Sequence, residues 1–170
     1  MPAKPKVPGT LNAAALFAVL AALAGIVTLV VTKVSGEQML QEVFAKALGT
    51  TPADIADNEE FKFQVGNAYD TLSSRGIIFT IYSAIYLALL VPMRLGMTWA
   101  RVLFNIFALQ AIALLTYTLT DEVPTMLKIL GGVNAAAALV AIVLVWLGPS
   151  NAFNRARKAY NKARKQFSPA

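Results

Sequence analysis

Four long stretches without a charged residue constrain this chain more than any other feature. They cover residues 11–32, 76–93, 102–120 and 129–147 and hold 22, 18, 19 and 19 residues. With a rise of about 1.5 Å per residue, helices of these lengths match a hydrocarbon core roughly 30 Å thick. The apolar runs are continuous rather than alternating, which favours helices over barrel strands, and a helix satisfies its own backbone inside lipid. The sequence therefore predicts an all-α, integral membrane four-helix bundle that forms a single membrane domain.

Charged residues are scarce and sort along the chain. They make up 14% of the sequence, against roughly 25% in an average soluble domain. All nine acidic residues lie in the first and third connections between the predicted spans. Ten of the fifteen basic residues lie before the first span, in the second connection or after the fourth span: Lys4, Lys6, Arg94, Arg101, Arg155, Arg157, Lys158, Lys162, Arg164 and Lys165. By the positive-inside rule, both termini are predicted to be cytoplasmic and residues 33–75 to lie outside.

The basic tail over residues 154–170 follows the last predicted span directly. It carries six Lys and Arg residues and no acidic residue. We interpret it first as a topology determinant and second as a binder of anionic headgroups, worth about 1 kcal/mol per residue near the surface; nucleic acid is not an expected partner. The candidate contacts to anionic lipid or to a partner are Arg155, Arg157, Lys158, Lys162, Arg164 and Lys165.

Aromatic residues recur along the same tail at a spacing of seven. Phe153, Tyr160 and Phe167 trace a narrow seam on a helix, with basic residues on its flanks. Such a helix could lie on the inner leaflet or pack on the cytoplasmic face of a partner. The sequence leaves both alternatives open.

Residues 35–74 form the predicted extracytoplasmic segment, a short helical cap between the first two spans. Ser35 and Gln38 have the spacing of a capping box, which predicts a helix start at Ser35. The short amphipathic helix that follows is predicted to stop at Gly49. A second helix start is predicted in "TPAD", with Pro52 in the first turn.

A third helix start is predicted in "DNEEF", because two glutamates suit the positive end of a helix dipole. Apolar residues along the cap are expected to pack chiefly on the protein's own helix ends, with an outer partner as the alternative. The candidates for outer partner contact are Met39, Val43, Phe44, Phe61 and Tyr69.

Small and amide residues predict how the spans pack. Gln110 and Asn134 are a candidate interhelical pair, a contact worth about 0.6 to 2 kcal/mol. Asn105 and Gln110 are five residues apart and point about 140° from each other on a helix, so they cannot line one polar track. Small residues that allow close helix approach are Ala14, Ala18, Ala22, Gly25, Ala84, Ala88, Gly132 and Ala136.

The residue types that usually carry chemistry are missing from the sequence. The chain has no His and no Cys, which removes imidazole and thiolate ligands, disulfides and thiolate catalysis. It also lacks a phosphate-cradling glycine loop and a Gly-x-Ser-x-Gly elbow. We therefore predict no catalytic residue, no metal and no cofactor, and the protein is not expected to be an enzyme.

Two quoted segments carry a resemblance to a group of known proteins. An Ala-rich first span, the tight turn "PMRLGMTWARVLFNIFA" and a fourth span ending in "VWLGPSNAFNRARK" resemble small four-helix membrane proteins of actinobacteria. Most of these have no assigned function. Some are accessory subunits of the respiratory supercomplex that joins a cytochrome bc complex to an oxidase. The resemblance covers residues 12–158 and contains no catalytic motif.

Three functions follow as alternatives. The resemblance implies an accessory or structural subunit in the bacterial plasma membrane, with membrane lipid and larger membrane protein subunits as partners. A lipid-interacting or envelope-maintenance protein would instead depend on the basic residues from Arg155 to Lys165. A small transporter or channel component would depend on Asn105, Gln110 or Asn134.

Overall fold

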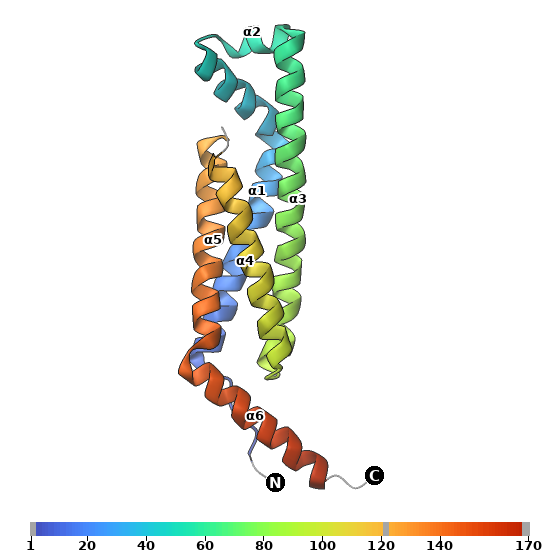
Figure 1. Cartoon of the computed structure of the whole chain (residues 1–170), viewed down its shortest axis with the longest axis vertical. Helices are drawn as coiled ribbons and strands as arrows, with labels where there is room; N and C mark the ends of the chain where they lie inside the picture. The colour runs from blue at the N-terminus through green and yellow to red at the C-terminus, as the bar shows by residue number, and fades with distance from the viewer. Residues whose placement is uncertain (1–2, 121–122, 168–170) are drawn as a thin grey trace.

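The protein is all-helical over the residues that the computed structural model describes, 3–120 and 123–167. Four helices form an elongated bundle, a short helix closes one end, and the last helix leaves the other end at an angle (Figure 1). The elements are α1 Gly9–Leu48, α2 Pro52–Asp57, α3 Glu59–Arg94, α4 Thr98–Thr120, α5 Thr125–Trp146 and α6 Gly148–Phe167. The predicted all-α class is confirmed.

Three of the bundle helices, α1, α3 and α5, are long and apolar enough to cross a membrane. In α4 the described stretch Thr98–Leu114 is also apolar. Large apolar side chains are exposed on the outside of the bundle, among them Leu16 at 69%, Val91 at 65% and Leu109 at 58%. A continuous apolar exterior suits lipid rather than water. These features indicate a helical membrane protein, and the fourth span over 102–120 stays a prediction.

The predicted helix start at Ser35 is wrong, because α1 continues through it to Leu48. Nothing near Ser35 breaks the helix, and extending a helix costs less than starting a new one. Tertiary contact also supports the continuation: a Cβ on Gly36 would lie 3.3 Å from the ring of Tyr69 on α3. The helix ends where predicted, at Gly49, which has a φ of 68° and donates its N–H to the Ala45 carbonyl.

The two other predicted helix starts are present. Thr51 caps α2, with its side chain accepting from the backbone N–H of Asp54 and the Asp54 side chain accepting from the N–H of Thr51. Pro52 is the first residue of that helix, where its missing N–H has no cost. Asn58 caps α3 by accepting from the backbone N–H groups of its first turn. From there α3 runs without interruption to Arg94, so the predicted outer cap consists largely of extensions of α1 and α3.

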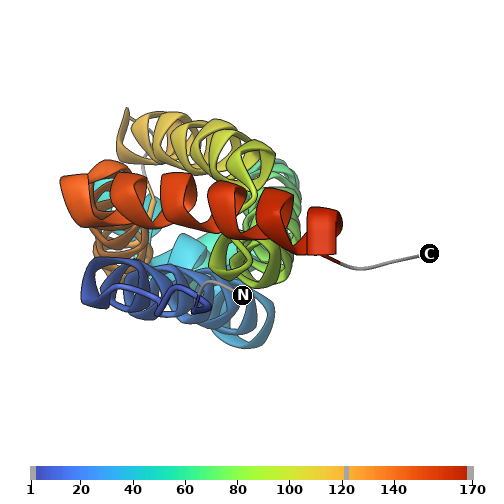
Figure 2. The same cartoon turned by 90° about the horizontal axis from the view of Figure 1, so that it is seen from below.

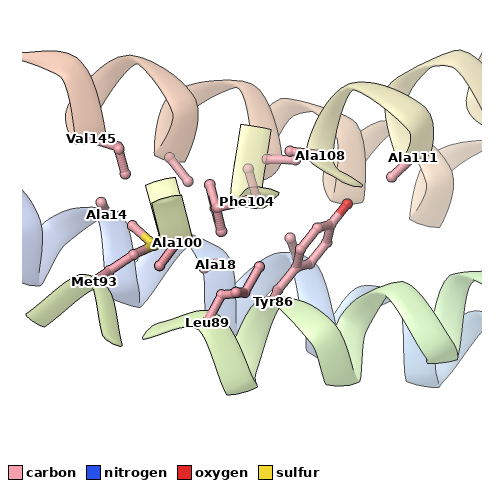
Figure 3. Close-up of a cluster of buried hydrophobic side chains, with 14 of the residues drawn as sticks. Ala14, Ala18, Tyr86, Leu89, Met93, Ala100, Phe104, Ala108, Ala111 and Val145 are labelled. Carbon is pink, nitrogen blue, oxygen red and sulfur yellow. The ribbon is translucent and has the colours of Figure 1, made fainter. Parts of the chain in front are cut away.

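The inner core is built by residues of α1, α3, α4 and α5, together with Phe153 of α6. Small side chains of α1, such as Ala14 and Ala18, face bulkier ones, such as Tyr86 and Phe104 (Figure 3). The Tyr86 hydroxyl donates to the Phe107 carbonyl at 3.0 Å and so links α3 to α4. The hydrophobic effect is largely absent between helices in lipid. Close van der Waals contact of this kind therefore stabilises the association of the helices.

The predicted packing residues divide into two groups. Those of α1 are all buried, as expected: Ala14, Ala18, Ala22 and Gly25. On α3 and α5 the predicted packing residues are not buried within the chain, since Ala84, Ala88 and Ala136 are exposed and Gly132 is half-buried. Instead α3 turns Ser83, Tyr86 and Leu89 inward, because the alanines of α1 leave room for large partners.

The tightest crossing brings three helices together at Gly25. A Cβ on this residue would lie 2.7 Å from Ser83 Oγ on α3 and 3.3 Å from Asn134 Nδ2 on α5. Asn134 donates to the Ala21 carbonyl of α1 at 2.7 Å. The predicted pair of Asn134 with Gln110 is therefore wrong, and Gln110 lies exposed on α4.

A second hydrophobic cluster lies at the end of the molecule that carries α2. We call it the outer cluster, and we call this end the outer end. The outer cluster joins α1, α2, α3 and the start of α5 through Leu40, Ile55, Val65, Leu72 and Leu127, among others. In Figure 1 the last part of α1 bends away from α3, and α2 bridges the gap between them. The outer end is thus a packed unit with its own core.

Candidate membrane-interface site

The turn between α5 and α6 brings several polar side chains together. Leu147 is extended, with φ −60° and ψ 156°. Pro149 cannot continue α5, because its ring would clash with the carbonyl four residues earlier, but it fits the first turn of a new helix. Viewed from below, α6 then crosses the end of the bundle beneath α3 and α4 (Figure 2). The tail helix therefore begins at Gly148, six residues before the predicted start of the tail at Asn154.

The predicted aromatic seam of α6 is anchored at its start. Phe153 is 5% exposed and belongs to the inner core. Tyr160 is half-buried, and the guanidinium of Arg157 lies 5.5 Å from the centre of its ring. The side chain of Phe167 lies outside the described residues. One end of α6 is thus fixed to the bundle.

Arg101 ties α4 to the start of α6. Its side chain is fully buried, with Nη2 donating to the Ser150 carbonyl at 2.7 Å and Nη1 donating to Asn151 Oδ1 at 3.3 Å. Burial lowers the pKa of Arg101, although a guanidinium stays charged in proteins. From its place in the sequence, Arg101 was predicted to lie in the second connection between the spans. In the structure its charge instead lies buried where α4 meets the start of α6, a region that we call the junction.

Hydroxyl and amide groups complete this junction. Ser150 Oγ donates to the Leu144 carbonyl at 3.0 Å and lies 2.8 Å from Thr10 Oγ1 of α1. Asn151 Nδ2 donates to the Trp146 carbonyl at 2.7 Å. These bonds satisfy carbonyls that the end of α5 leaves without helical partners. Four helices, α1, α4, α5 and α6, are joined at this point.

Two open grooves separate α6 from the end of the bundle. We call the first the turn groove; it has a volume of about 580 Å³ and is lined by Leu95, Gly96, Met97, Thr98, Trp99, Arg157, Lys158, Asn161 and Arg164. We call the second the hinge groove; it has a volume of about 390 Å³ and is lined by Thr98, Arg101, Trp146, Asn151, Asn154, Arg155 and Lys158. Thr98 and Lys158 belong to both, so the grooves adjoin.

Gly96 sets the shape of the turn groove. Its φ is 79°, which favours glycine, and a Cβ here would lie 2.7 Å from Cγ of Arg157. The stem of Arg157 therefore lies directly on the turn between α3 and α4. Of the predicted lipid or partner contacts, four line a groove: Arg155, Arg157, Lys158 and Arg164. Lys162 and Lys165 are exposed and line neither groove.

The predicted outer contacts lie at the opposite end of the molecule. Phe44, Phe61 and Tyr69 pack against the outer cluster, as the packing interpretation expects. Met39 and Val43 are half-buried. The aromatic residue that projects furthest was missed: Phe63 on α3 is 71% exposed. The available signal was its position between Phe61 and Val65, which share a buried face of α3, because a residue two positions from that face on a helix points outward.

The residues considered for a metal site or a transport path are not grouped in the part of the chain that the structure describes. Within residues 3–120 and 123–167, no group of three or more His, Cys, Asp or Glu residues could hold a metal ion. The three amides named for a transport path are also separated, since Asn134 is bound to backbone, Gln110 is exposed and Asn105 lies half-buried in α4.

We find no match for the chain among known protein families, curated proteins or solved structures. The class of protein therefore rests on the geometry described above. Three apolar helices of spanning length, an apolar exterior and a basic helix across one end define a helical membrane protein with a polar junction at that end.

Proposed function

We propose that the protein is a non-catalytic structural subunit of a larger bacterial membrane assembly. The observation that carries this proposal is the packed outer end. The last 16 residues of α1 extend beyond the predicted span, which is about 24 Å of helix. A connection between two antiparallel helices needs only about 2–8 residues. A long projection with its own hydrophobic core fits a contact surface rather than a simple link.

Exposed apolar residues at the same end of the molecule, on α1 and α3, support the proposal. Phe63 is 71% exposed and Leu48 is 51% exposed. Phe63 stands on the rigid helix α3, opposite the side that packs on the outer cluster. Aromatic side chains presented on a rigid support are the usual anchors of protein interfaces, because little conformational entropy is lost when they are buried.

The orientation of the molecule belongs to the same proposal. The basic residues of α6 and of the turn between α3 and α4 favour a cytoplasmic location for that end. The outer projection would then face the other side of the plasma membrane. The resemblance makes the respiratory bc–oxidase supercomplex the first host to test, and there the chain would add contact area rather than carry electrons.

A pull-down from native membranes in mild detergent, followed by mass spectrometry, tests the proposal. The tagged wild-type protein is expected to recover larger membrane subunits in a fixed ratio. Phe63→Glu is expected to reduce this recovery at least fivefold, because a carboxylate would be buried in the interface. Gln64→Glu is the matched control, since it places the same charge on the neighbouring exposed residue. Recovery of the wild-type chain alone with lipid would refute the proposal.

The second candidate is a lipid-interacting or envelope-maintenance protein. The two basic grooves beside α6 favour it, because they lie next to both tryptophans of the chain. In this case the protein would depend on anionic lipid rather than on a protein partner. The same pull-down separates the two candidates.

A further inference from the structure

We propose that the turn groove and the hinge groove together hold the headgroup of one anionic phospholipid with two phosphodiester groups, the chemistry of cardiolipin. This inference rests on the orientation in the proposed function, in which the basic end lies at the inner leaflet, and it adds a lipid ligand at that end. It concerns a lipid held by the subunit and stands apart from the protein partner at the outer end.

The charge of the grooves supports an anionic ligand. Five basic residues line them, and no acidic residue is among the described residues that do so. The turn groove has Arg157, Lys158 and Arg164, and the hinge groove has Arg101, Arg155 and Lys158. Basic pockets at the cytoplasmic ends of membrane helices are typical sites for phosphate-bearing headgroups. This concentration of charge in two hollows differs from a basic tail spread evenly in solvent.

Each groove is lined by an arginine whose buried Nε lacks a hydrogen-bond partner. Arg101 is fully buried and lines the hinge groove, and its Nε has no hydrogen-bond partner although both Nη atoms are bound. In the turn groove, Nε of Arg157 is likewise buried without a partner. A buried guanidinium N–H without an acceptor is costly, and a phosphate oxygen is a strong acceptor for it.

The start of α4 adds donors between these two arginines. Thr98 is the first residue of α4 and lines both grooves. The N–H groups of a first helical turn have no intrahelical partners, and the helix dipole favours an anion there. Lys158, the other shared residue, lies on α6. One phosphate would serve one groove and leave the other empty, whereas two phosphates joined through a glycerol would serve both.

The two tryptophans place the grooves at headgroup depth. Trp99 borders the turn groove and is 54% exposed, and Trp146 borders the hinge groove and is 42% exposed. Tryptophan prefers the boundary between headgroups and acyl chains. In Figure 2, α6 crosses beneath the bundle end, and residues of α6 and of the bundle end line both grooves. The acyl chains of the bound lipid would pass beside Trp99 and Trp146.

Because these are the only two tryptophans of the chain, their fluorescence reports on the site without a label. The full-length protein is reconstituted in phosphatidylcholine vesicles, and lipids with brominated chains, which quench tryptophan, are titrated in. The brominated lipids are cardiolipin, phosphatidylglycerol and phosphatidylcholine. We expect cardiolipin to reach half-maximal quenching at a mole fraction at least fivefold below that of phosphatidylglycerol, compared at equal phosphate.

A matched pair of double variants tests the site itself. Lys158→Gln with Arg164→Gln removes two charges that line the grooves, and Lys162→Gln with Lys165→Gln removes two from the same helix outside them. All four side chains are exposed, so both variants should fold, which circular dichroism checks. We expect the first variant to raise the cardiolipin mole fraction for half-quenching at least fivefold and the second to change it less than twofold.

Three results would overturn the inference. Equal losses in the two variants would show that α6 binds as a diffuse basic helix. Equal quenching by cardiolipin and phosphatidylglycerol at matched phosphate would exclude a site for two linked phosphates. Displacement of brominated cardiolipin by an equal concentration of inorganic pyrophosphate would show a site for a soluble phosphate. The partner pull-down uses a different readout, so either proposal can fail without the other.

Discussion

At the scale of single residues, the structure changes the role of Arg101 most. A basic residue between two predicted spans counts toward the positive-inside rule, and the sequence supports no more than that. In the fold its guanidinium lies in the junction, bound to Ser150 and Asn151. The same charge therefore acts as a structural contact between α4 and α6. Arg94, seven residues earlier, is exposed and donates to Asn12 Oδ1 at 3.4 Å.

This contrast gives a prediction about stability. Arg101→Met should lower the free energy of unfolding by about 1–3 kcal/mol, because it leaves the buried Ser150 carbonyl without its donor. Arg94→Met removes the same charge from the same end and should change stability by less than about 0.5 kcal/mol, as exposed substitutions usually do. Thermal unfolding in mild detergent measures both, and trypsin cleavage within α6 should accelerate only in Arg101→Met. Equal effects of the two substitutions would contradict the structural role of Arg101.

At the scale of elements, the helix ends follow local chemistry and the helix lengths do not. Gly49 ends α1 and Thr51 starts α2 as the sequence predicts. Ser35 has a comparable capping signal but lies within α1, since a cap acts only where the backbone leaves the helix. Packing of Gly36 on Tyr69 keeps α1 in contact with α3 beyond that position. Local signals thus mark possible ends, and packing selects among them.

The start of α2 should depend on pH through Asp54. Hydrogen bonds from Thr51 and then Thr50 lower the pKa of the Asp54 carboxyl below its ordinary value of 3.8. A lowered folded-state pKa means that the stabilisation is complete above 3.8 and is lost as the pH falls through the lower value. Backbone amides of α2 should therefore exchange hydrogen faster in acid than the intrinsic rate change accounts for. Asp54→Asn should abolish this pH dependence, whereas Asp57→Asn, at the other end of α2, should leave it in place.

At the scale of the whole molecule, two separate hydrophobic cores stabilise the fold. The inner core joins the bundle helices, where alanines of α1 face Tyr86 and Phe104 (Figure 3). The outer core lies around Ile55, beyond the predicted spans, where burial from water contributes about 25 cal/mol per Å² of apolar area. An apolar exterior surrounds the bundle, and basic residues gather at one end. Under the positive-inside rule, this arrangement predicts an orientation in which the basic end is cytoplasmic.

The orientation gives a prediction that the absence of cysteine makes simple to test. The chain has no Cys, so a single introduced cysteine is the only thiol. Gln64→Cys at the outer end should react with a membrane-impermeant maleimide on intact cells from which any outer barrier has been removed. Lys162→Cys on α6 should react only after the membrane is opened, because the basic end is cytoplasmic under the positive-inside rule. The opposite labelling pattern would invert the proposed topology.

The sequence by itself determined the features that depend on chain composition and near neighbours. The apolar runs predict membrane-compatible helices, because each must satisfy its backbone and match the hydrocarbon thickness. The stop at Gly49 and the caps at Thr51 and Asn58 depend on residues within one helical turn. The basic character of α6 is equally visible in the sequence.

Only the tertiary structure decided which faces meet. Ala84 looked like a packing residue but is exposed, while its neighbour Ser83 faces Gly25. Asn134 binds the Ala21 carbonyl, 113 residues away in the chain, and Arg101 reaches Ser150 across 49 residues. Spacing along one helix gives the period of the packing surface. The rotation of that surface depends on the sizes and polar groups of distant helices, which no local pattern contains.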